Sequence, residues 1–194
     1  LVDACVRRVL TAKFEWGLFE NPFVNEGRVA EIYSRQSSVD LSRKIAQQSL
    51  VLLKNDGDIL PLPRTLATIA VIGPSADSAR LMQGDYHYPS HFEHMFNPDV
   101  SPDAPTAAHD DVVNWEEHFP PTVTILDGIR RLVSPDTQVL YAHGCDILST
   151  DTSGFAEAAD VASRADVAIV VVGDKSGLAP GCTTGESIDR AMLD

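Results

Sequence analysis

The sequence predicts an open parallel α/β sheet with helices on both of its faces. Three short apolar runs rich in β-branched residues indicate strands: TIAVIG from Thr68, QVLYAHG from Gln138 and DVAIVVVGD from Asp166. Helical patterns lie between these runs, and strands that alternate with helices over short links are typical of a parallel sheet. The third run is apolar on both faces, which predicts a strand in the middle of the sheet.

Two helices are expected between the strands and two ahead of them. TVTILDGIRRLV carries its apolar residues on one helical face, and FAEAADVASRA offers a row of alanines for close packing. Upstream, Leu1 to Phe14 has the apolar spacing of a buried helix face, and Asp40 stands where an N-cap would begin a further helix. The polar stretch 29–40 between these two patterns predicts a domain boundary.

Composition and charge restrict the class of partner. The chain is 44% hydrophobic and 22% charged, the usual balance of a packed domain, and its net charge is −13. This charge argues against nucleic acid or an anionic membrane as a partner, because both require basic patches. A neutral ligand such as a sugar is compatible with it, and no apolar run approaches the roughly 18 residues of a membrane span.

The three cysteines, Cys5, Cys145 and Cys182, are widely spaced and odd in number. No two of them form a CxxC motif, and their spacing with histidines is not that of a zinc site, so a disulfide or metal framework is not expected. Free buried thiols are the default expectation, and a Cys145–Cys182 pair stays open as an alternative.

A Gly/Thr-rich stretch, GCTTGESIDR, follows the third strand and contains Glu186. Ligands of open parallel sheets bind beyond the carboxyl ends of the strands, and glycine lets a backbone approach another surface closely. In a water-poor crevice the pKa of Glu186 would rise, so that it could donate a proton to a leaving oxygen. A solvated loop carboxylate is the alternative. Asp174 could contact a ligand, whereas Asp189 and Arg190 are expected to pair with neighbours and hold the loop.

The sequence also contains candidates for a nucleotide site and for a metal site. IAVIGPSADSA stands where a nucleotide-binding turn would face a phosphate, but GxGxxG and GxxxxGK[ST] are absent, as is the GxSxG of serine hydrolases. Pro89 interrupts helical spacing among candidate zinc ligands, which favours imidazoles at a pocket rim over a metal site. Those candidates are His87, His91, His94, His109, Asp110 and Asp111.

A series of segments runs through the chain in order: FEWGLFENPFV, SLVLLKNDGDILPLP, IAVIGPSAD, GDY, TVTILDGIR, YAHGCD, SGFAEAADVASRADVAIVVVGD and CTTGESIDRAMLD. In this order they resemble glycoside hydrolase family 3, the family of β-glucosidases and β-xylosidases. The resemblance implies a (β/α)8-type barrel followed by a flavodoxin-like α/β sandwich. Residues 1–35 would be the end of the barrel domain and its linker, and residues 36–194 the sandwich domain, incomplete at its C-terminus.

The resemblance also implies a retaining, exo-acting β-glycosidase, in the first place a β-glucosidase that acts on a β-glucoside or oligosaccharide without a cofactor or metal. Glu186 matches the acid/base glutamate, and the nucleophile is an aspartate of the barrel, upstream of Leu1 and absent from this sequence. Such enzymes need two carboxyl groups about 5–5.5 Å apart, so this chain alone is expected to be inactive. Asp85, Tyr86 and His87 are expected at the pocket rim. A β-xylosidase of the same family and a non-catalytic module binding an anion or nucleotide are the alternatives.

Overall fold

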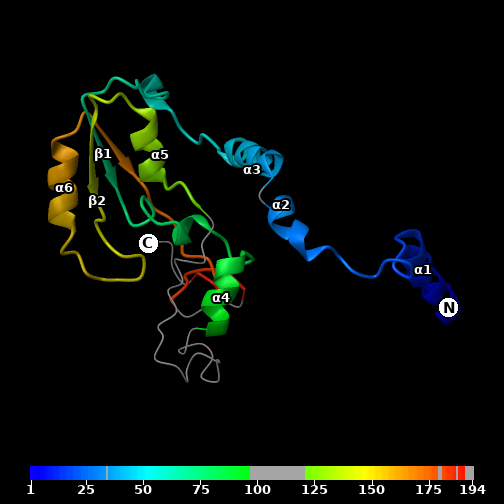
Figure 1. Cartoon of the computed structure of the whole chain (residues 1–194). Coiled ribbons are helices and arrows are strands. Elements are labelled where there is room, and N and C mark those ends of the chain that lie inside the picture. The colour runs from blue at the N-terminus through cyan, green and yellow to red at the C-terminus, as the bar shows by residue number, and fades with distance from the viewer. Residues whose placement is uncertain (34, 97–120, 179–180, 187, 191–194) are drawn as a thin grey trace. The chain divides into compact units, whose positions relative to one another are not determined.

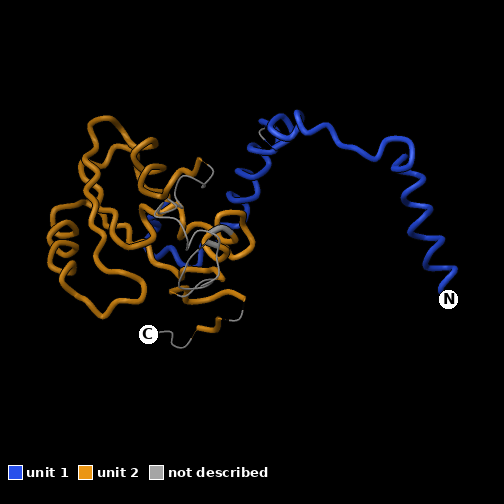
Figure 2. The backbone as a smooth tube through the Cα atoms, turned by 60° about the horizontal axis from the view of Figure 1, so that its bottom comes forward, with its two compact units in different colours: residues 1–60 blue, residues 61–194 orange. Residues whose placement is uncertain are grey.

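The computed structural model describes residues 1–33, 35–96, 121–178, 181–186 and 188–190. The chain divides into two compact units, residues 1–60 and 61–194 (Figure 2). The limits proposed above for the barrel and sandwich domains, 1–35 and 36–194, concern a longer protein and stay a prediction.

Unit 1 is helical, and its first helix confirms the helix predicted from Leu1 to Phe14. The described residues of unit 1 bury no residue of that helix, however, so the burial predicted for its apolar face is wrong within this unit. No helix in the described part of the chain is long and apolar enough to cross a membrane. The elements are α1 (Val2–Glu15), the 3-10 helix η1 (Glu26–Arg28), α2 (Val29–Tyr33), α3 (Gln36–Ser49) and the 3-10 turn η2 (Asp56–Asp58).

Asp40 is not the N-cap of α3. The helix begins at Gln36, and Arg35 occupies the N-cap position without a capping side chain. The side-chain amide of Gln36 instead donates to Asp40 Oδ1 at 2.9 Å, one helical turn further on. This i,i+4 contact explains why an acidic residue is tolerated inside the helix.

Unit 2 contains a parallel sheet of three strands in the order β2-β1-β3, which confirms the predicted fold class. The strands are β1 (Thr68–Ile72), β2 (Gln138–Ala142) and β3 (Val167–Val170). Among the strands that the structure describes the central one is β1, so the prediction that the third strand lies in the middle is wrong for this part of the sheet. One face of β3 is uncovered in the described sheet, since Val170 is 63% exposed and Val172, two residues beyond the strand, is 74% exposed. The composition of this run is nevertheless that of a strand buried on both sides.

Two helices cover opposite faces of the sheet, α5 (Ile125–Leu132) and α6 (Phe155–Ser163) (Figure 1). Successive residues of a strand point to opposite faces, so β1 contributes to two separate clusters. Ile69 and Val71 pack with Leu126 of α5, and Ala70 and Ile72 pack with Val161 of α6. The small side chains of α6, predicted from its alanines, allow this helix to lie close to the sheet.

The chain reverses its direction of travel across the sheet between β1 and β3. From β1 it crosses to β2 on one side, and from β2 it returns past β1 to β3. The strand ends are close here, because a Cβ on Gly73 (φ +126°) would lie only 2.1 Å from the carbonyl oxygen of Val171. Such a reversal opens a crevice beyond the carboxyl ends of the two strands. The segments that follow β1 and β3 are therefore the first place to look for a site.

Candidate active site

Two segments meet at the reversal point between β1 and β3. The first, which we call the 84–87 segment, follows β1 and the short 3-10 helix η3 (Arg80–Met82) and leads into α4 (Tyr88–Phe96). The second, the 174–190 loop, follows β3. Hydrogen bonds that span about a hundred positions of sequence join them, and they bring together Asp85, Tyr86 and Glu186 of the predicted site.

The described part of the 174–190 loop folds back on itself. Ser176 forms a parallel bridge with Thr184, and the amide of Gly177 donates to the Thr184 carbonyl at 3.0 Å. Nearby, the amide of Thr183 donates to the Lys175 carbonyl at 2.8 Å, and its hydroxyl accepts from the Lys175 amide at 3.0 Å. These hydrogen bonds join the start of the loop to Thr183 and Thr184, close to Glu186.

Glu186 is fixed through its backbone, while its side chain is exposed. Its amide donates to Asp85 Oδ2 at 2.8 Å, and its Oε2 accepts from the Tyr86 hydroxyl at 2.7 Å. Within the described part of the chain Oε1 has no hydrogen-bond partner, so this oxygen is available to carry a proton. The water-poor surrounding expected for this carboxyl group is not supplied by the described residues.

Asp85 and Tyr86 keep the protonation states that these contacts need. The hydrogen bond from the Ser176 hydroxyl is the main cause that lowers the pKa of Asp85; burial opposes it, and the Glu186 amide lowers the pKa further. Asp85 is therefore a carboxylate, and each of its two oxygens accepts a hydrogen bond, one from Ser176 and one from Glu186. The hydrogen bond to Glu186, followed by its charge, raises the pKa of Tyr86, which keeps the phenol protonated as a donor.

The other predicted contacts with substrate lie around this centre. Asp174 binds Arg190 with one oxygen and accepts from the Thr183 hydroxyl with the other at 3.1 Å, which confirms that Arg190 pairs within the loop. The ring of His87 is half-buried, its Nδ1 donates to the Gly84 carbonyl, and burial is the main cause that lowers its pKa. Substrate contact by Asp174 and His87 stays a prediction.

Three ionic residues that no sequence pattern singles out contact one another next to this site: Arg80, Glu93 and Lys175, which we call the Arg80 cluster. Arg80 Nε donates to Glu93 Oε2 at 2.8 Å, and Lys175 Nζ donates to Glu93 Oε1 at 3.1 Å. The three side chains are only 13%, 16% and 25% exposed, so Glu93 is the counter-ion of two largely buried cations. Burial by itself raises the pKa of Glu93, but the hydrogen bonds and charges of Arg80 and Lys175 outweigh it and hold the pKa below 4.5.

Replacement of Glu93 by glutamine should therefore cost stability in a pH-dependent way. Because the folded-state pKa of Glu93 is depressed, its ionic contribution is complete above about pH 4.5 and is lost as the pH falls through the folded-state value. Urea unfolding at pH 7 should show a loss of up to about 3 kcal/mol for Glu93→Gln, since two cations lose their partner. The difference from the unsubstituted chain should shrink below pH 4.5; a constant difference down to pH 3 would contradict this role.

The stretch that contains His87, His91 and His94 is partly helical, so the interruption of helical spacing expected at Pro89 is wrong. Pro89 lies in the first turn of α4, where its missing N–H costs no hydrogen bond, so it begins the helix and does not interrupt it. His94 donates from Nδ1 to the Leu178 carbonyl at 3.2 Å and so joins α4 to the 174–190 loop. Among the described residues no three His, Cys, Asp or Glu side chains are arranged to hold a metal ion, and His109, Asp110 and Asp111 lie outside them.

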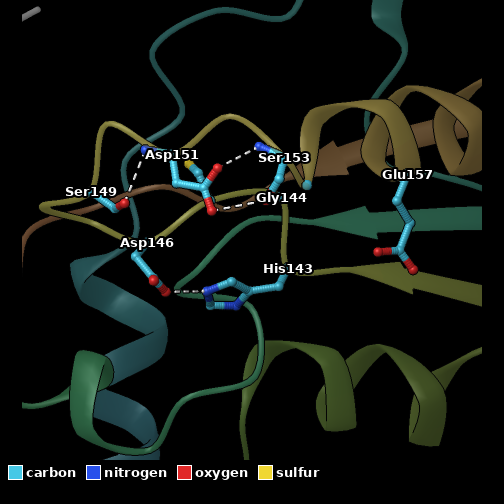
Figure 3. A pocket seen from close by; sticks show the side chains of 9 residues that line it. His143, Gly144, Asp146, Ser149, Asp151, Ser153 and Glu157 are labelled. Carbon is cyan, nitrogen blue, oxygen red and sulfur yellow. Dashed lines mark hydrogen bonds and ion pairs between the residues drawn. The ribbon is translucent and has the colours of Figure 1, made fainter.

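A depression lies at the carboxyl end of β2, the strand on the other side of β1 from β3 (Figure 3). Its volume of about 150 Å³ is below the 300 Å³ or more of ordinary ligand pockets. Its polar groups bind one another: His143 pairs with Asp146 at 2.8 Å, and Asp151 accepts from both the amide and the hydroxyl of Ser153. We therefore place the candidate active site at Glu186 and not here.

The structure also bears on two alternatives left open by the sequence. The turn after β1 is followed by the three-residue η3, so no α-helix N-terminus faces a phosphate there. All three cysteines are free, which is the default expectation, and no Cys145–Cys182 bond is formed.

The profile of the glycosyl hydrolase family 3 C-terminal domain matches residues 50–194, which include the whole sheet and both segments of the candidate site. The chain belongs to glycosyl hydrolase family 3. This confirms the predicted resemblance.

Relatives within family 3 are β-xylosidases and β-glucosidases. A β-xylosidase of Formosa agariphila is 31% identical over 100% of this chain and 23% of its own length. A lysosomal β-glucosidase of Dictyostelium discoideum is 28% identical over 98% of this chain and 21% of its own. A solved structure of a β-glucosidase involved in saponin metabolism from intestinal bacteria has a TM-score of 0.66 and 26% identity, over 90% of this chain and 24% of that one. The chain thus spans less than a quarter of the length of these family 3 relatives.

Proposed function

We propose that this chain is part of a retaining, exo-acting β-glycosidase, in which Glu186 is the general acid/base. Glu186 protonates the oxygen of the departing group and later deprotonates the water that releases the sugar. The nucleophile is an aspartate supplied by an upstream barrel domain of the same polypeptide. No cofactor takes part.

The observation that carries this proposal is the way in which Glu186 is held. Its backbone amide is bound by Asp85, whereas its side chain is exposed and, among the residues that the structure describes, is held through Oε2 by Tyr86. A glutamate whose backbone is fixed and whose carboxyl group is accessible suits a residue that must act on a group bound by another domain. The exposed apolar face of α1 supports the upstream partner, because a row of apolar side chains normally packs against a second layer.

A β-glucosidase and a β-xylosidase remain the two candidate specificities. The named activities of the relatives include both. We give the β-glucosidase first, in line with the solved structure of a β-glucosidase that matches 90% of this chain.

The proposal is tested by comparing residues 1–194 with a longer polypeptide that includes the upstream domain. The longer protein should hydrolyse an aryl β-glucoside or β-xyloside, and NMR should detect the β-anomer of the sugar as the first product. Residues 1–194 alone should hydrolyse neither, since one carboxyl group cannot fill both roles.

Turnover by residues 1–194 alone would contradict a site divided between two domains. An α-anomer as first product would contradict retention. If the longer protein hydrolyses neither glycoside but binds a nucleotide in a calorimetric titration, the non-catalytic binding module is the correct interpretation.

A further inference from the structure

We propose that Arg80 is a positioning residue for Glu186: it anchors the 174–190 loop and thereby sets where the backbone of Glu186 lies. This inference rests on the proposed role of Glu186 as proton donor. Arg80 itself is more than 80% buried and does not reach the exposed carboxyl group, so it acts through the loop and not on substrate.

The guanidinium of Arg80 contacts the loop at two separate points. Nη1 donates to the carbonyl oxygen of Ser176 at 2.8 Å, and Nη2 lies 3.8 Å from the Sγ of Cys182. The close fit requires a glycine between these contacts, because a Cβ on Gly177 would lie 2.4 Å from Nη2 and 2.6 Å from that sulfur. The start and the middle of the loop are thus held by one side chain from outside it.

A short chain of contacts leads from Arg80 to Glu186. Ser176, whose carbonyl is held by Arg80, donates its hydroxyl to Asp85 Oδ1, and Asp85 Oδ2 accepts from the Glu186 amide. If Ser176 shifts, Asp85 loses one of its two donors and the position of Glu186 changes with it. In catalysis a displacement of about 1 Å can cost about 100-fold in rate.

An arginine is required because a lysine cannot make these contacts together. The guanidinium presents five N–H donors in a rigid plane, of which Nε serves Glu93 while Nη1 serves Ser176. An ammonium group is a single point charge, and Lys175 already occupies the other oxygen of Glu93. Glu93 permits the burial of Arg80 by balancing its charge.

The test is Arg80→Met in the longer polypeptide, with Arg164→Met as the matched control. Arg164, the C-cap residue of α6, also pairs with an aspartate, Asp160, but both side chains are more than half exposed. Arg80→Met should lower kcat/KM, which reports the first bond cleavage, by about 10- to 100-fold on glycosides with poor leaving groups, which need the proton, and by less than about threefold on activated aryl glycosides. Arg164→Met should leave kcat/KM on both classes of substrate unchanged.

Arg80→Lys should recover only part of the activity that Arg80→Met loses. A lysine keeps the charge beside Glu93 but cannot also donate to the Ser176 carbonyl. If Arg80→Met does not fold, Arg80→Lys carries the same comparison between the two classes of substrate. An equal loss on both classes, or no loss on either, would overturn the positioning role while leaving the role of Glu186 intact. The proposed function itself fails if Glu186→Gln shows an equal loss on both classes.

Discussion

Glu186→Gln in the longer polypeptide should lower kcat by about 10²- to 10⁴-fold on glycosides whose leaving groups are poor, the range ascribed to general acid–base catalysis. The amide has the shape of the carboxyl group and still accepts from Tyr86, so the loop keeps its contacts. It cannot donate a proton to the departing oxygen. Glycosides with activated aryl leaving groups need no such proton, and their bond cleavage should slow by less than about tenfold.

Two further measurements make this result specific. Glu186→Ala should be rescued by azide, because a small anion can attack the glycosyl intermediate without a general base, and the product should then be the β-glycosyl azide. Asp189→Asn is the matched control and should leave both classes of glycoside unaffected. Asp189 is an exposed acidic residue of the same loop, and the pairing expected for its side chain is not found among the described residues. An equal loss on both classes of glycoside, without rescue by azide, would remove Glu186 from the acid/base role.

Gly185→Ala should have the second largest effect, although it changes no reacting group. Gly185 has φ +143°, and a Cβ there would lie 2.2 Å from the carbonyl oxygen of Gly177 and 3.1 Å from Asp85 Oδ2. A clash with a backbone atom cannot be relieved by rotating a side chain. The bridge between Ser176 and Thr184 must therefore open, at a cost of about 1–3 kcal/mol, and turnover of poor substrates should fall by about 100-fold.

The matched control is Gly181→Ala in the same loop. Gly181 also has a positive φ, +82°, but no atom lies within 4 Å of the added Cβ. It should show only the backbone cost of about 1–2 kcal/mol and keep most of its turnover. Hydrogen exchange at the Glu186 amide should rise in Gly185→Ala and not in Gly181→Ala. Equal turnover in the two variants would show that the backbone position at 186 does not depend on the contact with Gly177.

The architecture of the sheet was predictable because the spacing of apolar residues over a few positions indicates each strand and each helix. The runs TIAVI, QVLYA and VAIV are strands as expected, and the helices between them cover opposite faces. The glutamate after the third strand was also predictable as a candidate, since parallel strands carry ligand sites beyond their carboxyl ends. These inferences need only the neighbours of each residue along the chain.

The predictions that were wrong, and the residues that were missed, depend on contacts between segments that lie far apart in the sequence. The third strand was expected in the middle of the sheet, because its composition reports two apolar faces but not which strand lies beside it. Likewise, the spacing in α1 identifies an apolar face and not what covers it. The Arg80 cluster was missed, because residues 80, 93 and 175 form no spacing pattern and meet only when α4 and the 174–190 loop pack together.

The amino-acid sequence by itself determined the strands, the helices, their alternation and the presence of a carboxyl group on a Gly/Thr-rich loop, since period and glycine content act over a few residues. Only the tertiary structure decided that Asp85 holds the amide of Glu186, 101 positions away, and that Arg80 holds the carbonyl of Ser176, 96 positions away. The physical reason is that hydrogen bonds and ion pairs act over about 3–4 Å in space, whatever the separation along the chain.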